Sequence, residues 1–212
     1  MKLTKYEHAC FTVEKDGKFL IVDPGKFTKD FVVPENVIAI VVTDGHGDHI
    51  DPELLATIFA KNPEATLVSL PVVIDSLSNF PSRAVAAGDT ITIAPFNLEF
   101  FGGTHAMVHP SIPLVGNVGV LINEAIYYPG DSFSQPDKPV ELLALPVSAP
   151  WLKLSETIDF LLAVKPKKVF PTHNALNSPI AEHMINSMLP KFAARVSSEY
   201  IPLQPEQSIE LN

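Results

Sequence analysis

Four side chains of metal-binding type lie within six residues of one short loop. The apolar run 37–42 predicts a buried strand, and Pro52–Lys61 predicts a helix with Asp51 as its N-cap. The loop between the two elements carries Asp44, His46, Asp48 and His49. Imidazole nitrogens and carboxylate oxygens hold zinc and manganese in proteins. The loop therefore predicts a metal site, and a polar surface loop before a helix cap is the alternative.

More histidines and aspartates follow other predicted strands. Asp23 ends the strand 18–22, and His105 follows the strand 97–101 through two glycines and a threonine. Asp131 follows the strand 125–128, and His173 follows the strand 167–170. Strands alternate with predicted helices at 52–61, 71–77 and 154–164, which is typical of an α/β layer. Because strand ends at one edge of such a layer converge, these side chains can meet in one crevice.

The loop resembles a motif of the metallo-β-lactamase fold superfamily, His-x-His-x-Asp-His. Asp44 departs from that pattern, because it occupies the first position, where the family usually has histidine. Residues 7–11, 21–25 and 128–132 resemble small stand-alone members of the superfamily, the group that includes the ascorbate-6-phosphate lactonase. The resemblance implies a four-layer αββα sandwich of two mixed sheets with helices on the outer faces.

The resemblance also implies two metal positions. Asp44, His46 and His105 would form the first position. Asp48, His49 and His173 would form the second, and Asp131 would join the two; Asp48 and Asp131 are the expected catalytic residues. One or two divalent ions are expected, zinc or manganese first and iron or magnesium next. An extra aspartate lowers the net charge of the site, which favours harder metals at the first position and could leave that position weak or empty.

Three further residues are candidates near the site. In the related proteins the counterparts of His8 and Asp23 lie near the metal loop, so both are expected to touch substrate or support the metal ligands. His8 could equally be a histidine at a strand edge. His109 lies in the proline-containing loop 106–116, where it could contact substrate or be exposed. Trp151 could form an apolar wall or pack in the core.

Composition limits the other function classes. The chain has 212 residues and 46% hydrophobic residues, which favours one metallo-β-lactamase-like domain over residues 1–212. The net charge of −9 and the scattered basic residues disfavour nucleic-acid binding. No apolar run is long enough to cross a membrane and the N-terminus lacks a signal-peptide pattern, so a cytoplasmic location is expected. Cys10 is the single cysteine, which excludes an intrachain disulfide and a thiolate zinc cluster.

The favoured function is that of a metal-dependent hydrolase. It would use a metal-activated hydroxide on a small polar or anionic molecule, such as a lactone, phosphoester or related ester. The alternative is a non-catalytic relative that binds a metal or ligand and has a degenerate first site. A single-iron oxygenase stays open, whereas a serine hydrolase is unsupported because no Gly-x-Ser-x-Gly occurs. The oligomeric state is left open.

Overall fold

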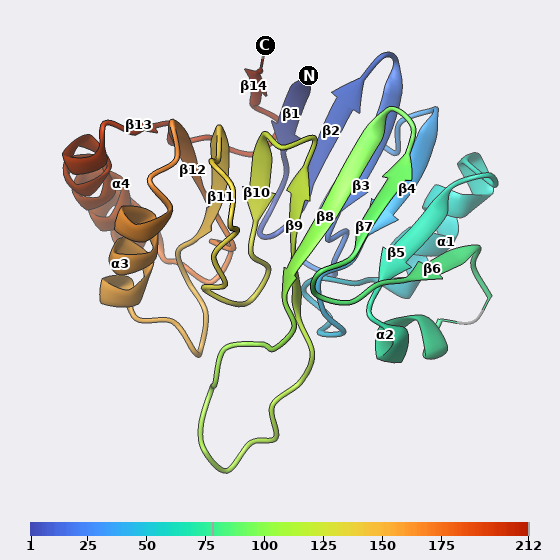
Figure 1. Ribbon diagram of the computed structural model, residues 1–212, viewed down its shortest axis with the longest axis horizontal. Helices are drawn as coiled ribbons and strands as arrows, with labels where there is room; N and C mark the ends of the chain where they lie inside the picture. The colour runs from blue at the N-terminus through green and yellow to red at the C-terminus, as the bar shows by residue number, and fades with distance from the viewer. Residues whose placement is uncertain (78, 212) are drawn as a thin grey trace.

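Two mixed β-sheets face each other in the computed structural model, which describes residues 1–77 and 79–211 (Figure 1). The first sheet has the strand order β14-β1-β2-β3-β4-β5-β6. Its strands are β1 Lys2–Lys5, β2 Phe11–Lys15, β3 Lys18–Val22, β4 Val37–Val41, β5 Thr66–Ser69, β6 Ser82–Ala84 and β14 Ser208–Glu210. The strands from β14 to β3 pair antiparallel, and those from β3 to β6 pair parallel.

The second sheet repeats this mixture with the order β13-β12-β11-β10-β9-β8-β7. Its strands are β7 Thr90–Ile93, β8 Phe96–Gly102, β9 Val118–Ile122, β10 Ile126–Tyr128, β11 Leu142–Pro146, β12 Lys168–Thr172 and β13 Glu199–Tyr200. The strands from β7 to β10 pair antiparallel, and those from β10 to β13 pair parallel. Three strands of this sheet, β8, β10 and β12, precede candidate site residues. These residues are His105, Asp131 and His173 respectively.

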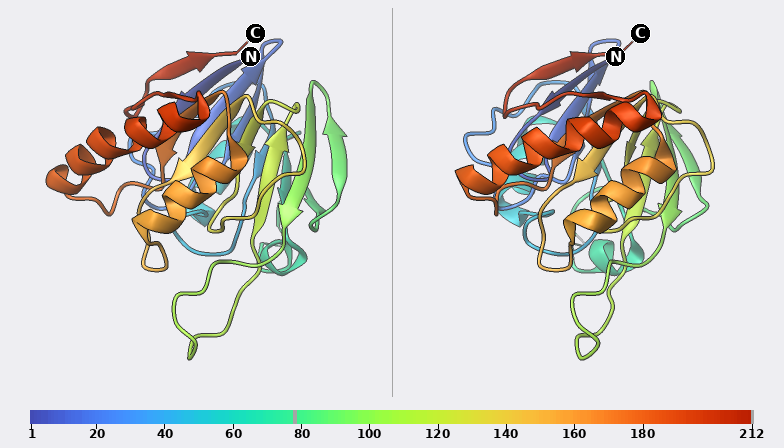
Figure 2. Two further views of the ribbon diagram at one scale, coloured as in Figure 1. Left: turned by 60° about the vertical axis from the view of Figure 1, so that its left-hand side comes forward. Right: turned by 90° about the vertical axis from the view of Figure 1, so that its left-hand side faces the viewer.

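Helices cover the outer faces of the two sheets (Figure 2). They are α1 Pro52–Lys61, α2 Pro71–Asp75, α3 Leu154–Val164 and α4 Pro179–Ala193, which the 3-10 turn η1 Ala194–Val196 follows. The helices α1 and α2 accompany the first sheet, and α3 and α4 lie side by side on the second. The four-layer αββα architecture is therefore confirmed. None of the described helices has the length and apolar character needed to cross a bilayer.

Alternating side chains of the second sheet build two separate cores. Val120 and Tyr128 join the large core that includes both sheets. Leu121 and Tyr127, their neighbours along β9 and β10, join the smaller core under α3 and α4. Successive side chains of a strand point to opposite faces, so a sheet covered on both sides must be apolar on both. This burial explains the continuous apolar runs in the sequence.

Local signals set most element boundaries. Asp51 accepts a hydrogen bond from the Glu53 backbone nitrogen at 3.0 Å, and Pro52 begins α1, as the sequence predicts. The bounds of α1 and α3 agree with the predicted ranges. The sequence also predicts a last helix over about residues 179–189, and α4 extends beyond that range through Pro190 to Ala193. Leu189 and Ala193 are both buried, so packing stabilises the turn that proline would otherwise weaken.

The predicted domain 1–212 includes Ser78 and Asn212, which lie outside the described residues.

Candidate metal centre

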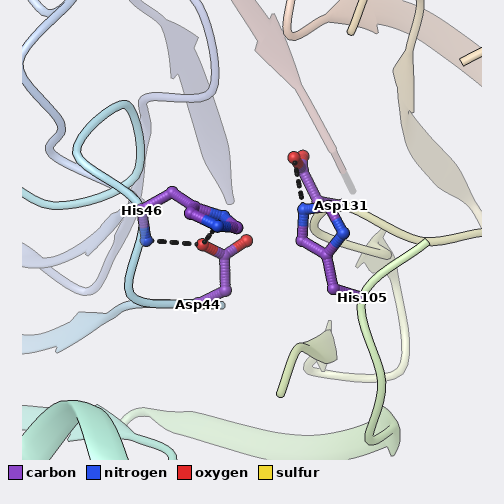
Figure 3. Close-up of side chains that lie close together, drawn as sticks. All are labelled: Asp44, His46, His105 and Asp131. Atoms are coloured by element: carbon purple, nitrogen blue, oxygen red, sulfur yellow. Dashed lines mark hydrogen bonds and ion pairs between the residues drawn. The ribbon is translucent and has the colours of Figure 1, made fainter. Parts of the chain in front are cut away.

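The loop between β4 and α1 is held in shape by its own aspartate. Asp44 is fully buried, and its Oδ1 accepts a hydrogen bond from the His46 backbone nitrogen at 2.8 Å. The same oxygen lies 3.0 Å from Nδ1 of His46, whose side chain is 47% exposed (Figure 3). An aspartate that accepts from a backbone nitrogen two residues ahead forms a common turn. Asp44 therefore turns the loop inward and orients the His46 ring at the same time.

The end of β3 packs directly against this loop. Gly25 is the point of closest approach, since a Cβ there would lie 1.9 Å from the Asp48 backbone oxygen. The Lys26 backbone nitrogen donates to the Gly47 oxygen at 2.8 Å. A residue larger than glycine would thus push the Asp48 backbone out of place. The Asp-Pro-Gly sequence after β3 is what brings Asp23 beside the loop.

Asp23 orients His49 from behind. Its Oδ2 lies 2.6 Å from Nδ1 of His49 and also accepts from the Thr43 hydroxyl at 2.6 Å. Its Oδ1 accepts from the Thr43 backbone nitrogen at 2.8 Å. With two oxygens that only accept, Asp23 places the His49 proton on Nδ1. The Nε2 lone pair of His49 is left to face the centre of the site.

His105 and His173 are oriented in the same way by backbone carbonyls. His105 Nδ1 donates to the Ala106 oxygen, and His173 Nδ1 donates to the Ser148 oxygen. A carbonyl oxygen has no proton to give, so each ring carries its proton on Nδ1. The Nε2 atoms of both rings point to Asp131, at 3.1 Å from one or other of its carboxylate oxygens. Figure 3 shows His105 and Asp131 beside Asp44 and His46.

At the centre of the site, imidazole nitrogens and carboxylate oxygens face one another at short distances. His49 Nε2 and His173 Nε2 lie 3.2 Å apart, and each lies 3.1 Å from Oδ1 of Asp131. Asp131 Oδ1 and Asp44 Oδ2 are buried and make no hydrogen bond with any described residue. Lone pairs and carboxylates at such distances repel one another unless a positive charge, either a bound metal ion or a second proton on the imidazoles, lies between them. The donor set therefore fits a divalent metal ion.

Ionisation in this cluster follows from the same geometry. Burial alone would raise the pKa of the Asp131 and Asp48 carboxyls, but the neighbouring imidazoles hold both pKa values well below their usual range. Burial lowers the pKa of His173, and hydrogen bonds to Asp131 and Asp48 outweigh that effect and raise it to about 9. Both carboxylates are thus ionised at neutral pH, and in the absence of a metal His173 holds a proton that a bound cation would displace.

His8 lies on the other side of Asp48. The Ala175 backbone nitrogen donates to His8 Nδ1 at 3.2 Å, so the ring proton is on Nε2, which donates to Asp48 Oδ2 at 3.1 Å. Burial lowers the pKa of His8 to about 4, so the ring is neutral. The His8 backbone oxygen also accepts from the His173 nitrogen at 2.8 Å. His8 is therefore a donor that orients Asp48 and His173, and its lone pair does not reach the centre.

Two residues that sequence reasoning did not assign to the centre hold Asp131 in place. Trp151 Nε1 donates to Asp131 Oδ2 at 2.9 Å, although the sequence suggested only an apolar wall or core packing for this residue. Asn117 Oδ1 accepts from the Asp131 backbone nitrogen at 2.8 Å, and its Nδ2 donates to the Pro129 oxygen. No sequence pattern marks either contact, because each joins separate loops.

A cavity of about 470 Å³ opens onto the cluster. Among the predicted site residues, its lining includes His46, Asp48, His105, Asp131 and His173. Asp48 is the most exposed aspartate of the cluster, at 23% of its side chain. The buried residues Asp44 and His49 lie behind this lining. A small molecule in the cavity would thus meet the donor set directly.

A family model described as "Beta-lactamase superfamily domain" matches residues 2–173 of this chain. The chain belongs to the β-lactamase superfamily. The matched range includes every candidate ligand from Asp44 to His173.

Relatives within the β-lactamase superfamily cover most of the chain. Protein Rv0786c of Mycobacterium tuberculosis is 37% identical over 186 residues, which are 85% of this chain and 87% of that protein. A protein of Carboxydothermus hydrogenoformans named "UPF0173 metal-dependent hydrolase" is 26% identical over 194 residues, which are 82% of this chain and 84% of the relative. Among solved structures, the metallo hydrolase Igni18 of Ignicoccus hospitalis has a TM-score of 0.77 at 18% identity, covering 100% of this chain and 99% of its own. That likeness shows the shared fold.

The structure brings most of the predicted superfamily residues into one cluster. Two sets have ligand atoms within 4.8 Å of one another and contain only predicted metal ligands: Asp44, His46, His105 and Asp131 in one, and His49, Asp131 and His173 in the other. Asp48 joins His173 and His8 in a third set. His109 is exposed and bonds to Ser111 at 2.7 Å, so this structure does not place it in the cluster. His183, which the sequence predicts to lie on the surface or in the core without a ligand role, is exposed on α4.

Proposed function

We propose that this member of the β-lactamase superfamily is a metal-dependent hydrolase that cleaves a lactone, phosphoester or related ester of a small molecule. One observation carries the proposal. The Nε2 atoms of His49 and His173 and the unpaired Oδ1 of Asp131 face one another at 3.1 to 3.2 Å. Such a concentration of lone pairs is stable around a cation. The names of the sequence relatives support the same class of activity.

The ligand sets support two metal positions that share Asp131. Asp44, His46 and His105 would hold the first ion, with the unpaired Asp44 Oδ2 directed at it. Asp48, His49 and His173 would hold the second. The imidazoles favour zinc and the carboxylates favour manganese, and iron or magnesium is the next alternative. Divalent ions in these positions supply Lewis acidity and an acidified water as nucleophile.

The protein residues would orient the reacting groups. Asp48 faces the cavity and is ionised, so its carboxylate can accept a hydrogen bond from water and direct it to the substrate. His8 keeps Asp48 in that orientation through its Nε2 proton. Trp151 lines the cavity beside Asp131 and excludes water from that side. These roles need a substrate whose scissile bond lies over the cluster.

Elemental analysis combined with an activity panel tests the proposal. The chain is purified without added metal and compared with His173→Ala and with His183→Ala, a matched control that removes an exposed histidine from α4. We expect bound divalent metal in the native chain and in His183→Ala, and a loss of metal in His173→Ala. Native chain without bound metal, or equal metal in all three proteins, would overturn the metal site.

Hydrolysis separates an enzyme from a relative that only binds metal. Native chain and Asp131→Ala are assayed against lactones and phosphoesters, before and after treatment with a chelator. We expect cleavage that the chelator removes and that Asp131→Ala lacks. Metal-loaded protein that cleaves no member of the panel would favour the non-catalytic alternative. The inward orientation of Asp44 argues against a degenerate first site, because its Oδ2 is buried and directed at the cluster.

A further inference from the structure

The cavity above the metal cluster has apolar walls. Its outer lining contains Phe27, Val108, Pro150, Trp151 and Leu176. These residues come from four different loops, which follow β3, β8, β11 and β12. Four loops thus each deliver at least one apolar side chain to the lining of one cavity, and small-molecule sites are lined mainly by apolar side chains. The aspartates and histidines of the lining belong to the cluster itself, and Lys26 adds a charged side chain outside it.

One of these loops extends far from the sheets. The segment 103–117 between β8 and β9 projects beyond the body of the molecule (Figure 1). Val108, Ile112, Leu114 and Val115 line a second cavity of about 70 Å³ beside His46 and His105. These four side chains are exposed in spite of their apolar character. An apolar ligand that covers these side chains removes apolar surface from water, which favours binding.

The cavity is larger than a metal centre needs. A hydrophobic cavity of about 150 Å³ holds one benzene molecule. The volume of about 470 Å³ therefore leaves room for an apolar group of several carbons after two ions and a water have been placed. Asp48 and Asp131 line the floor and Asp44 lies behind it, so the single lysine of the lining, Lys26, leaves no excess positive charge for a strongly anionic substrate unless metal supplies it.

We propose that the substrate carries an apolar alkyl or aryl group of about six or more carbons, which packs against Val108, Trp151 and Leu176 while its ester or lactone group lies over the cluster. This inference deepens the proposed hydrolase function and rests on it. It departs from the polar or anionic substrate that the sequence suggested. The reason is that substrate polarity is set by the loops around the cluster, and their side chains meet only in the folded chain.

Intrinsic fluorescence can test the apolar site without any catalysis. Trp151 is the only tryptophan of the chain, and it lines the cavity. The full chain is titrated with the neutral alcohols ethanol, butanol, hexanol and octanol, which need no metal for binding. We expect the dissociation constant to fall about two- to fourfold for each added methylene group. A dissociation constant that does not change with chain length would overturn the proposal.

Two wall variants and one matched control locate the site. Val108→Asn and Leu176→Asn replace side chains that are 43% and 53% exposed, so neither should disturb the core. Val32→Asn makes the same change at a valine that is 80% exposed and outside the cavity lining. We expect both wall variants to weaken octanol binding at least threefold and Val32→Asn to leave it unchanged. Equal effects in all three variants would contradict binding at this wall.

An ester series separates this inference from the hydrolase proposal. The metal-loaded chain is assayed with esters whose acyl groups have two to ten carbons. We expect kcat/KM to rise with acyl length in the native chain and to rise less in Leu176→Asn. Chain-length-dependent alcohol binding without cleavage of any ester would overturn the hydrolase proposal and leave the apolar site standing. Cleavage with a kcat/KM that stays constant or falls as the acyl group lengthens would overturn the apolar site and leave the hydrolase proposal standing.

Discussion

Asp23 Oδ2 and His49 Nδ1 lie 2.6 Å apart, and both side chains are fully buried. Asp23 also accepts two hydrogen bonds from Thr43, so this carboxylate ties the end of β3 to the end of β4 and to the metal loop. Partners of this kind set the tautomer and the direction of a ligating imidazole. The first prediction concerns this contact.

Asp23→Asn should weaken metal binding about 10- to 100-fold, because the neutral amide no longer favours a proton on His49 Nδ1. Competition with a chromophoric chelator measures the affinity. Asp30→Asn is the control, since it makes the same change at an exposed aspartate in the same loop. Unchanged affinity in Asp23→Asn would show that the geometry of His49 does not depend on this carboxylate.

Trp151→Phe should lower kcat about tenfold or more while the protein stays folded. The variant keeps an aromatic ring in the wall but removes the hydrogen bond to Asp131 Oδ2, and hydrogen bonds to charged groups contribute roughly 1.5 to 3 kcal/mol. Steady-state kinetics on the best ester of the panel measure the loss. Phe133→Leu is the control, because Phe133 packs against the same indole without a hydrogen bond to Asp131. A similar fall in both variants would assign the effect to packing.

Asp44→His should raise the metal content of the first position and shift its preference from manganese towards zinc. The change replaces a carboxylate oxygen by an imidazole nitrogen and adds one positive charge to the metal-loaded site. Elemental analysis after dialysis against equal zinc and manganese reports both quantities. Asp75→His, on the exposed side of α2, should behave like the native chain. Native stoichiometry and native metal ratio in Asp44→His would count against Asp44 as a ligand.

Lys5 should make the free energy of unfolding depend on pH in the alkaline range. Its amine is fully buried, donates to the Tyr6 oxygen and to Asn174 Oδ1, and has a pKa that burial lowers from 10.5 to about 8. Since the unfolded chain binds this proton more tightly, the contribution of Lys5 to the free energy of unfolding rises between about pH 8 and pH 10.5. The full rise is about 3 kcal/mol as an order of magnitude.

Urea unfolding of the native chain and of Lys5→Met at pH 7.5, 9 and 10.5 measures this contribution. We expect the free energy of unfolding of Lys5→Met to increase less over this range than that of the native chain. Lys2→Met, an exposed change on the same strand, should follow the native curve. Parallel curves for all three proteins would show that Lys5 titrates normally in the folded state.

Much of the scaffold of the site could be predicted from local sequence. The run 37–42 corresponds to β4, the pair Asp51 and Pro52 begins α1, and Lys18–Val22 is a strand that ends at an aspartate. These features depend on contacts between near neighbours, so the pattern of a few residues is sufficient. The strand β6 was not predicted, because its three residues are exposed and show no apolar pattern.

The sequence by itself determined which side chains could bind a metal and that they stand at strand ends. Only the tertiary structure decided which rings face the centre, because each orientation depends on a partner far along the chain. Ala175 sets the tautomer of His8 across 167 residues, and Trp151 reaches Asp131 from another loop. The apolar character of the cavity was decided in the same way, since its walls meet only after four loops have folded around the cluster.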